Sequence, residues 1–458
     1  MISPEVRAHM LPKTNARIAG APGRLDVMGG IADYSGSLVL QMPLDRQTTA
    51  VLQPRNDPAI EIVSLRGGTP FHLNVQLGAL LDGDLDTPAK LVAYFAANES
   101  ERWGAYILGV VHACLVRRPP ARGVPTNGFR LVIESRVPEG KGISSSAALE
   151  VACLGVISAH YGRAMLSEEI AEACQWAENH IAGAPCGIMD QMASACGREG
   201  RLLRLRCQPA TIEGHVLIPD SYRFYGIDSG IRHAVTGAGY GTVRTAAFMG
   251  YRMIADVAGF PVQRDDDGVR VHDDKWHGYL ANIPPAYFVE HFDHRLPDRM
   301  SGSEFLGRYH GITDSVSRVQ PNGSYNVRQA TRHPIFENAR VERFADLLAA
   351  LEREPANAIE MGKLMYDSHA SYSACGLGSD GTDRLVTLAA EVGADVGVFG
   401  AKITGAGSGG TVAIFATVDA AAQVRAIAAR YSAETGHLAE VFADSGPGMA
   451  EQGISLSF

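Results

Sequence analysis

The chain has 458 residues, of which 46% are apolar and 20% are charged, the composition of an ordinary globular protein. At about 150 residues per domain, this length predicts two or three domains. The formal net charge of −9 argues against a protein that coats nucleic acid, whose affinity would depend on clustered cations.

Nothing in the sequence predicts secretion or a membrane partner. Residues 1–20 contain no apolar core of signal-peptide length, and no uncharged apolar run reaches the roughly 18 residues of a spanning helix. The seven cysteines are odd in number and include no CxxC pair, which does not suit a disulfide framework. We therefore expect a cytoplasmic protein.

The clearest elements lie in the first half of the chain. Alternating, β-branched residues at 128–134 predict a strand that runs into a Gly-rich turn at 137–142. Residues 144–160 predict a helix with small and apolar faces. A second helix is expected from Ser167 to about Ile181, because Ser167 can cap it and three glutamates near its start suit the helix dipole.

The second half of the chain shows fewer clear elements. Residues 222–228 predict a strand, and a Gly-rich turn at 402–410 leads into a strand-like segment at 411–416. Between 262 and 325 the pattern is irregular, which predicts loops and short helices. A domain boundary is expected between 205 and 220.

The first Gly-rich loop, at 138–147, has the chemistry of a phosphate site. Its glycines allow a close backbone approach to an anion, and the helix that follows presents unpaired N–H groups. Three consecutive serines add hydroxyl groups. A Gly/Ser turn that only caps a helix is the alternative. No Walker A motif is present, so a nucleotide site here would belong to another class.

The second Gly-rich run, at 404–410, could be mistaken for a dinucleotide fingerprint. Its spacing is wrong, and a strand rather than a helix follows it. We therefore do not expect a Rossmann domain.

Four blocks in this order resemble the GHMP kinase superfamily, which includes galactokinase, homoserine kinase and mevalonate kinase. The first, at 21–34 (APGRLDVMGGIADY), resembles the galactokinase signature. The others are the loop at 138–147, the segment at 183–191 (GAPCGIMDQ) and the loop at 405–410. Together they span residues 21 to 410, nearly the whole chain.

The resemblance implies a two-domain α/β (α+β) fold with the active site in the cleft between the domains, at residues 1–210 and 211–458. It also implies ATP and Mg²⁺ as cofactors and a small-molecule sugar as substrate. The galactokinase-like branch consists of sugar 1-kinases, which phosphorylate the anomeric hydroxyl. The resemblance gives no oligomeric state.

Two residues match the family's catalytic groups. Asp190 would accept the proton of the C1 hydroxyl, since a sugar hydroxyl is a poor nucleophile. Arg24 would lie beside it and stabilise negative charge on the transferring phosphoryl group. A buried structural Asp and an Arg in a Pro-Gly turn are the alternative interpretations.

The resemblance also implies an ATP and Mg²⁺ site. Ser146 and Glu178 match the Mg²⁺ ligands, and a hard dication needs few protein oxygens. The alternative for Glu178 is a solvated residue on a helix. The alternative for Trp103 is a position in the apolar core. The residues that would contact ATP are Trp103, Gly140, Gly142, Ser144, Ser145 and Ser146.

The resemblance places three sugar contacts. Asp33 matches the aspartate that binds sugar hydroxyls, typically O3 and O4. Tyr240 and the backbone of Gly187 match further contacts.

The first block departs from galactokinases where the family has Glu-His and this chain has Gly30-Ile31. The family Glu accepts the C6 hydroxyl of galactose, so a sugar without that hydroxyl would leave a buried carboxylate unpaired. L-Arabinopyranose is D-galactopyranose without its C6 group. Ile31 would offer an apolar wall, and the block also resembles the kinase domain of plant L-arabinokinases. Asp26, where the family has Asn, is a smaller departure.

Other functions stay open at this point. Gly30 could make space for a bulkier C6 group, so a galactokinase or a galacturonokinase-type enzyme is an alternative. A uronic acid carboxylate would need a cation close by. Some proteins of this fold bind sugar and ATP as sensors without turnover, which is the alternative outside catalysis.

Overall fold

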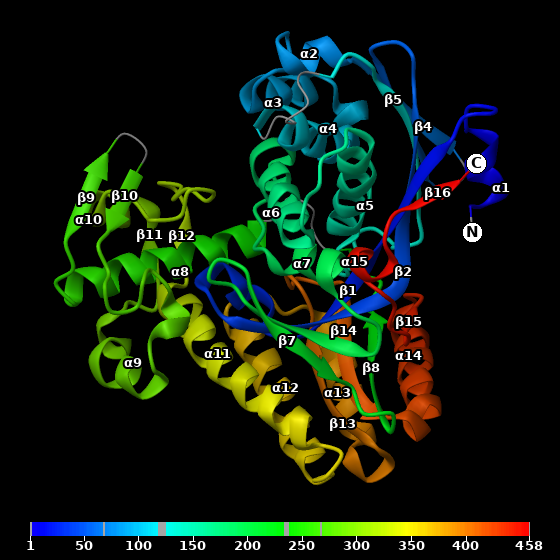
Figure 1. Cartoon of the computed structure of the whole chain (residues 1–458). Coiled ribbons are helices and arrows are strands. Elements are labelled where there is room, and N and C mark those ends of the chain that lie inside the picture. The colour runs from blue at the N-terminus through cyan, green and yellow to red at the C-terminus, as the bar shows by residue number, and fades with distance from the viewer. Residues whose placement is uncertain (1, 67–68, 118–124, 233–237, 266–267, 458) are drawn as a thin grey trace.

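Two β-sheets organise the chain (Figure 1). The computed structural model describes residues 2–66, 69–117, 125–232, 238–265 and 268–457. The larger sheet has eight strands in the order β16-β1-β2-β5-β3-β4, and β6 extends it from β2 and carries β7. Its pairs are antiparallel except the parallel pair β3–β5. Its strands are β1 (Ala16–Met28), β2 (Leu38–Pro54), β3 (Ala59–Arg66), β4 (Thr69–Gln76), β5 (Phe129–Ser135), β6 (Arg201–Arg206), β7 (Thr211–Leu217) and β16 (Ser455–Ser457).

A group of helices packs on the larger sheet. The central helix is α5 (Ser145–His160), which contacts β1 and β2 and has twelve buried residues. Its small and apolar residues let the neighbouring helices approach on several sides, so this helix is buried almost all round. The other helices of this part are α1 (Pro4–Ala8), α2 (Leu77–Leu81), α3 (Pro88–Ala97), α4 (Ala105–His112), α6 (Ser167–Ala177), α7 (Met189–Cys196) and α15 (Met449–Gln452).

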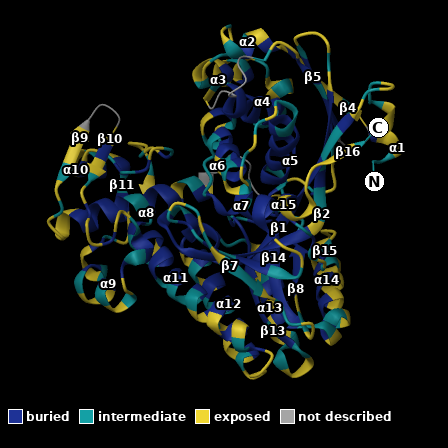
Figure 2. Ribbon diagram, in the orientation of Figure 1, coloured by how far each residue is buried: buried dark blue, intermediate teal, exposed yellow. Residues whose placement is uncertain are grey.

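The smaller sheet has four antiparallel strands in the order β13-β14-β8-β15. They are β8 (Tyr222–Asp228), β13 (Val398–Ile403), β14 (Thr411–Thr417) and β15 (Val441–Phe442). Buried residues of this sheet and of the helices beside it form two apolar clusters, and the strands of the sheet are coloured as buried in Figure 2. Those helices are α11 (Val327–Ala350), α12 (Asn357–Ala374), α13 (Asp380–Val392) and α14 (Ala421–Thr435).

The segment from 238 to 325, which we call the side segment, lies to one side of both sheets in Figure 1. The apolar core that includes Trp276, Phe288 and Phe305 also contains Ile31 and Tyr372, so it joins this segment to the rest of the chain. The short helices expected between 262 and 325 are present, and short antiparallel strand pairs accompany them. Its elements are α8 (Ala238–Val257), β9 (Val262–Asp265), β10 (Gly268–Val271), α9 (Pro285–His291), α10 (Gly302–Tyr309), β11 (Met300–Ser301) and β12 (Ser324–Tyr325).

The strands expected near 128–134, 222–228 and 411–416 and the helix expected at 144–160 are present. The second expected helix, α6, ends earlier and continues as a π-helical turn, η4 (Glu178–Ala182). The division at residues 210 and 211 stays a prediction, and β7 and β16 both join the larger sheet. Within the described part of the chain, no helix is long and apolar enough to cross a membrane.

Candidate active site

Arg24 and Asp190 are 166 positions apart in sequence and form an ion pair. Arg24 lies on β1 at a register shift, and Asp190 lies in the first turn of α7. The Nε and Nη2 atoms of Arg24 lie 2.9 Å and 2.7 Å from Oδ1 of Asp190. The arginine is 2% exposed and the aspartate 24%. Both contacts use Oδ1, so the carboxylate is held by one oxygen and still reaches solvent.

The Gly-rich loop lies beside this pair and ends at the N-terminus of α5. Gly140 and Gly142 both have a φ of 72°, and a Cβ on either would meet nothing closer than 3.7 Å. The carbonyl of Gly142 accepts a hydrogen bond from Nη1 of Arg24 at 2.8 Å. The loop is therefore anchored to the ion pair while its outer surface stays open.

The start of α5 has the features of an anion site. Ser144, the N-cap residue, makes no side-chain capping bond, and its buried Oγ has no hydrogen-bond partner among the described residues. Ser145 and Ser146 occupy the first helical turn. Helix N-termini leave N–H groups unpaired and carry partial positive charge. An uncapped N-terminus with an unpaired hydroxyl fits a phosphate group, so these residues could hold the phosphates of ATP.

The second Gly-rich loop packs against the first. The Oγ1 of Thr411 donates a hydrogen bond to the carbonyl of Lys141 at 2.7 Å. The ammonium group of Lys141 pairs with Asp228, which is fully buried at the end of β8. Elements of both sheets therefore meet at the Gly-rich loop at 138–147.

Ser146 and Glu178 lie close together. The Glu178 carboxyl accepts a hydrogen bond from Nε2 of Gln191 at 2.6 Å, and the Ser146 hydroxyl lies near the same carboxyl. Burial raises the pKa of Glu178 to about 7, and the charge of Asp190 adds to this shift. A hydroxyl and a carboxylate are hard oxygen donors, and Mg²⁺ keeps several waters, so this pair fits that ion. Among the described residues, no group of three or more His, Cys, Asp or Glu side chains is arranged for a metal.

Glu150 was missed by the sequence analysis. It lies on α5, is fully buried, and its Oε2 accepts a hydrogen bond from Nε2 of Gln191 at 3.3 Å. Burial raises the pKa of Glu150 well above its ordinary value, and nearby Glu178 adds to the shift. The sequence did contain a signal for Glu150, because it is a single glutamate in a helix of otherwise small and apolar residues. A buried glutamate almost always has a partner.

Asp33 is buried near Asp190. It lies in the 3₁₀-helix η1 (Gly30–Ser35), and its Oδ1 accepts a hydrogen bond from the Tyr34 N–H at 2.7 Å. A Cβ on residue 187 would overlap the Asp33 carboxylate, so Gly187 is required for this close approach. Burial raises the pKa of Asp33 to about 7; the charge of Asp190 adds to the shift and that of Arg244 opposes it.

We expect Asp33→Asn to stabilise the fold at high pH. The native carboxyl stays protonated up to about pH 7, whereas it ionises near pH 4 in the unfolded chain, so raising the pH across this window favours unfolding. Asn does not ionise, so it does not lose stability as the pH rises across this window. In urea unfolding, the variant's advantage in free energy of unfolding should grow by roughly 3 kcal/mol between pH 5 and pH 8. Asp346→Asn, at an exposed position of α11, is the control. An advantage independent of pH would contradict the burial argument.

Arg244 is a second buried arginine near Asp33 that the sequence analysis did not identify. It lies on α8, and its Nε and Nη2 atoms lie 2.8 Å and 2.9 Å from the two oxygens of Asp314. Its Nη1 donates to the carbonyl of Cys186 at 3.0 Å, and its guanidinium lies 5.6 Å from the ring centre of Tyr34. The positive charge of Arg244 is therefore paired with the carboxylate of Asp314.

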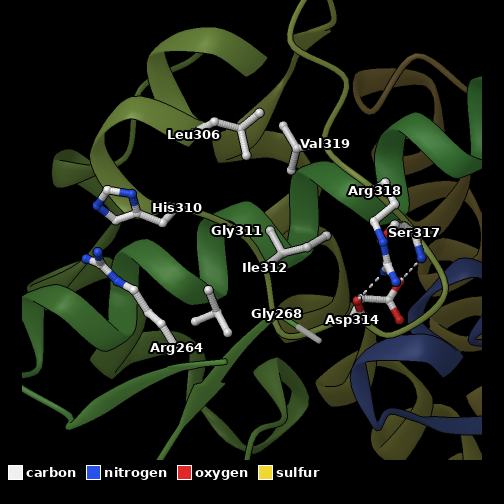
Figure 3. A pocket seen from close by; sticks show the side chains of 11 residues that line it. Arg264, Gly268, Leu306, His310, Gly311, Ile312, Asp314, Ser317, Arg318 and Val319 are labelled. Carbon is white, nitrogen blue, oxygen red and sulfur yellow. Dashed lines mark hydrogen bonds between the residues drawn. The ribbon is translucent and has the colours of Figure 1, made fainter. Parts of the chain in front are cut away.

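A cavity of about 580 Å³ lies in the side segment, away from Asp190 (Figure 3). Arg264 and His310 lie at one end, and Asp314 lies at the other (Figure 3). Asp314, which lines this cavity, pairs with Arg244, and Nη1 of Arg244 donates to the Cys186 carbonyl.

The structure corrects one interpretation of Gly30. The glycine does not open space for a larger substrate group, because a Cβ on it would overlap the hydroxyl oxygen of Tyr372. Ile31 is fully buried, and its N–H donates to the same hydroxyl at 2.8 Å. Sequence reasoning could not see this, because Tyr372 comes from α12, more than 300 residues later. A substrate contact at Gly30 or Ile31 stays a prediction.

Two other expected contact residues lie in partly apolar surroundings. Tyr240 is buried and packs edge-on against Tyr34, with ring centres 5.8 Å apart. Trp103 is half-buried and packs edge-on against Phe71 at 6.0 Å. Their contacts with sugar and ATP stay predictions.

Family models match three parts of the chain. Residues 105–198 match the GHMP kinases N terminal domain, and residues 347–433 match the GHMP kinases C terminal domain. Residues 11–54 match the galactokinase galactose-binding signature.

Two curated relatives match along nearly the whole chain. An L-arabinokinase from Arabidopsis thaliana is 40% identical over 95% of this chain, which spans only 46% of that relative. A galactokinase from Chloroflexus aurantiacus is 31% identical over 92% of this chain and 89% of its own length.

Solved structures share the fold. A Lactococcus lactis galactokinase, solved in complex with galactose, has a TM-score of 0.71 at 21% identity and covers 95% of both chains. A mevalonate kinase has a TM-score of 0.53 at 15% identity, over 94% of this chain and 99% of its own. The expected mixed α/β GHMP kinase fold is confirmed. The chain therefore belongs to the galactokinase-like sugar kinases of the GHMP kinase superfamily, a group of ATP-dependent phosphotransferases.

Proposed function

We propose that this protein phosphorylates the anomeric C1 hydroxyl of a monosaccharide at the expense of ATP, and that the sugar is L-arabinose. The observation that carries the kinase proposal is the Arg24–Asp190 pair, which lies beside the uncapped N-terminus of α5. This arrangement offers a proton acceptor, a fixed cation and a phosphate site within one small region.

Each group has a role that follows from its surroundings. Asp190 accepts the proton of the sugar hydroxyl, because its carboxylate is held by one oxygen and reaches solvent. Arg24 orients that carboxylate and presents charge toward the transferred group. Asp33, whose carboxylate lies against Gly187, accepts hydrogen bonds from the sugar hydroxyls.

The α5 N-terminus and its serines hold the phosphates, and Ser146 with Glu178 holds the metal ion. When bound, ATP with Mg²⁺ supplies the phosphoryl group and neutralises the charge that develops on it. The chain contributes positioning and fixed dipoles, which are the main sources of catalysis in phosphoryl transfer.

The choice of L-arabinose rests on position 30. L-Arabinopyranose has the ring hydroxyl configuration of D-galactopyranose but lacks the C6 group. Gly30 provides no acceptor for a C6 hydroxyl, and the space next to it is filled by Tyr372. The identity of 40% to an L-arabinokinase, against 31% to a galactokinase, supports the same choice.

A uronic acid is less well supported. Its carboxylate would need a cation without a partner, and the buried arginines beside Asp190 and Asp33 are each paired: Arg24 with Asp190, and Arg244 with Asp314.

The test is ADP release with ATP and Mg²⁺ across L-arabinose, D-galactose, D-galacturonate, D-glucuronate and L-fucose. We expect L-arabinose to give the highest kcat/KM. A faster reaction with galactose or galacturonate would overturn the sugar assignment and leave the kinase proposal standing. Binding of both ligands without ADP release from any sugar would support a sensor instead.

A further inference from the structure

The buried hydroxyl of Tyr372 joins two loops of the candidate site. Tyr372 lies on α12 and is fully buried, with its ring edge-on to His333 and ring centres 5.1 Å apart. Its Oη accepts a hydrogen bond from the Ile31 N–H at 2.8 Å and donates one to the Gly405 carbonyl at 3.0 Å. The single proton of the hydroxyl is therefore used within the protein.

The same hydroxyl occupies the place where a side chain at residue 30 would begin. A Cβ on Gly30 would overlap Oη of Tyr372 and would lie 2.6 Å from its Cζ. It would also lie 2.9 Å from Oδ2 of Asp26, and the φ of Gly30 is +38°. A larger residue at position 30 and Tyr372 in its present position therefore exclude each other.

This contact lies next to the proposed sugar residue. Gly30 is the first residue and Asp33 the fourth residue of the same 3₁₀-helix. In such a helix, residues three positions apart lie on one face. A side chain at residue 30 would thus flank Asp33. On the far side of the hydroxyl, a Cβ on Gly405 would lie 3.1 Å from Nη2 of Arg24. The hydroxyl of Tyr372 therefore lies between η1, which carries Asp33, and the loop at Gly405, which lies beside Arg24.

We infer that Tyr372 is a positioning residue that sets the sugar specificity of this site. Its hydroxyl replaces a side chain at residue 30 and fixes the main chain of Ile31, so that the site is closed where a hexose would need room for an additional CH₂OH group. The inference rests on the proposed sugar 1-kinase function. Tyr372 itself touches no substrate and acts through η1.

The first test compares kcat and KM of Tyr372→Phe for L-arabinose and D-galactose. Removing the hydroxyl unpairs the Ile31 N–H and the Gly405 carbonyl and loosens η1. We expect KM for L-arabinose to rise about tenfold with kcat within about threefold, and the ratio of kcat/KM for arabinose to that for galactose to fall about tenfold. An equal loss for both sugars would mean a purely structural role and would overturn the inference, as would unchanged kinetics.

Tyr251→Phe is the matched control. Tyr251 is also buried, and its hydroxyl donates to Oδ2 of Asp273 at 2.8 Å in the side segment. This variant loses a buried hydroxyl of the same kind, so a fall in its unfolding midpoint with an unchanged sugar ratio is expected. A changed sugar ratio in this control would overturn the assignment of specificity to Tyr372.

The second test measures unfolding and needs no sugar. Gly30→Ala should lower the unfolding midpoint strongly in the wild type, and much less in a Tyr372→Leu background, where the overlapping hydroxyl is gone. Equal losses in both backgrounds would overturn the shared-space argument. If the wild type phosphorylates neither sugar, the proposed function fails, and this coupling still decides whether residues 30 and 372 compete for the same space.

Discussion

Asp190→Asn should lower kcat by about 10²–10⁴-fold, the range that one general base contributes. Asn can accept hydrogen bonds from Arg24 through its amide oxygen, so the contact between β1 and α7 survives the change. It cannot take a proton from the sugar hydroxyl. ADP release measures turnover, and calorimetric titration measures binding; both ligands should bind to the variant within a few-fold of wild-type affinity.

The control for Asp190→Asn is Asp57→Asn. Asp57 is also held by an arginine, with Nε and Nη2 of Arg55 at 2.7 Å and 2.6 Å, but it lies on an exposed turn between β2 and β3. Its replacement should leave kcat unchanged. A kcat of Asp190→Asn within tenfold of wild type would refute the assignment of Asp190 as the base and favour a structural role for the ion pair.

The Gly-rich turn at 138–144 and the start of α5 could be predicted from the sequence, because the residues that form them are contiguous. Glycines, three serines and the start of a helix are contiguous, and a helix N-terminus attracts anions wherever it lies. The Arg24–Asp190 pair could be predicted only from the family resemblance, since no local pattern connects residues 166 positions apart. The same holds for Ser146 and Glu178, which come from different helical segments.

What the sequence analysis missed depends on packing between distant segments. Arg244 looks like an ordinary polar residue of a helix until Asp314 and the Cys186 carbonyl are placed around it. The alternative that Gly30 makes space for a bulkier substrate group fails, because a missing side chain says nothing about which neighbour fills its volume. Here the neighbour is Tyr372, and only the tertiary structure shows it.

The largest expected effect on stability concerns a buried ion pair between the two sheets. Nζ of Lys402, on β13, lies 2.9 Å from Oδ2 of Asp26, on β1, and both side chains are fully buried. Oδ1 of Asp26 also accepts hydrogen bonds from the Gly30 N–H at 3.0 Å and from Nε2 of Gln41 at 2.8 Å. Burial opposes ionisation of Asp26, but the charges of Lys402 and Arg24 more than offset it and hold its pKa below the ordinary value.

Lys402→Met removes one positive charge. Asp26 is then a buried carboxylate with too little positive charge nearby to balance it. Breaking such a pair costs about 3–5 kcal/mol, whereas replacing both partners is often nearly neutral. We therefore expect a loss of about this size in urea unfolding at pH 8. The double variant Asp26→Asn/Lys402→Met should recover most of the loss, because the Asn oxygen can still accept the bonds from Gly30 and Gln41.

The pH dependence separates charge from packing in the Lys402→Met variant. Without Lys402, the pKa of Asp26 should rise, and its protonated form carries no uncompensated charge. The variant's loss relative to wild type should therefore shrink as the pH falls from 8 to 5, since protonation then favours the folded variant. A loss of the same size at both pH values, with no recovery in the double variant, would mean that Lys402 contributes through the packing of its aliphatic chain. The buried charge would then not be what ties the Gly30 segment to the smaller sheet.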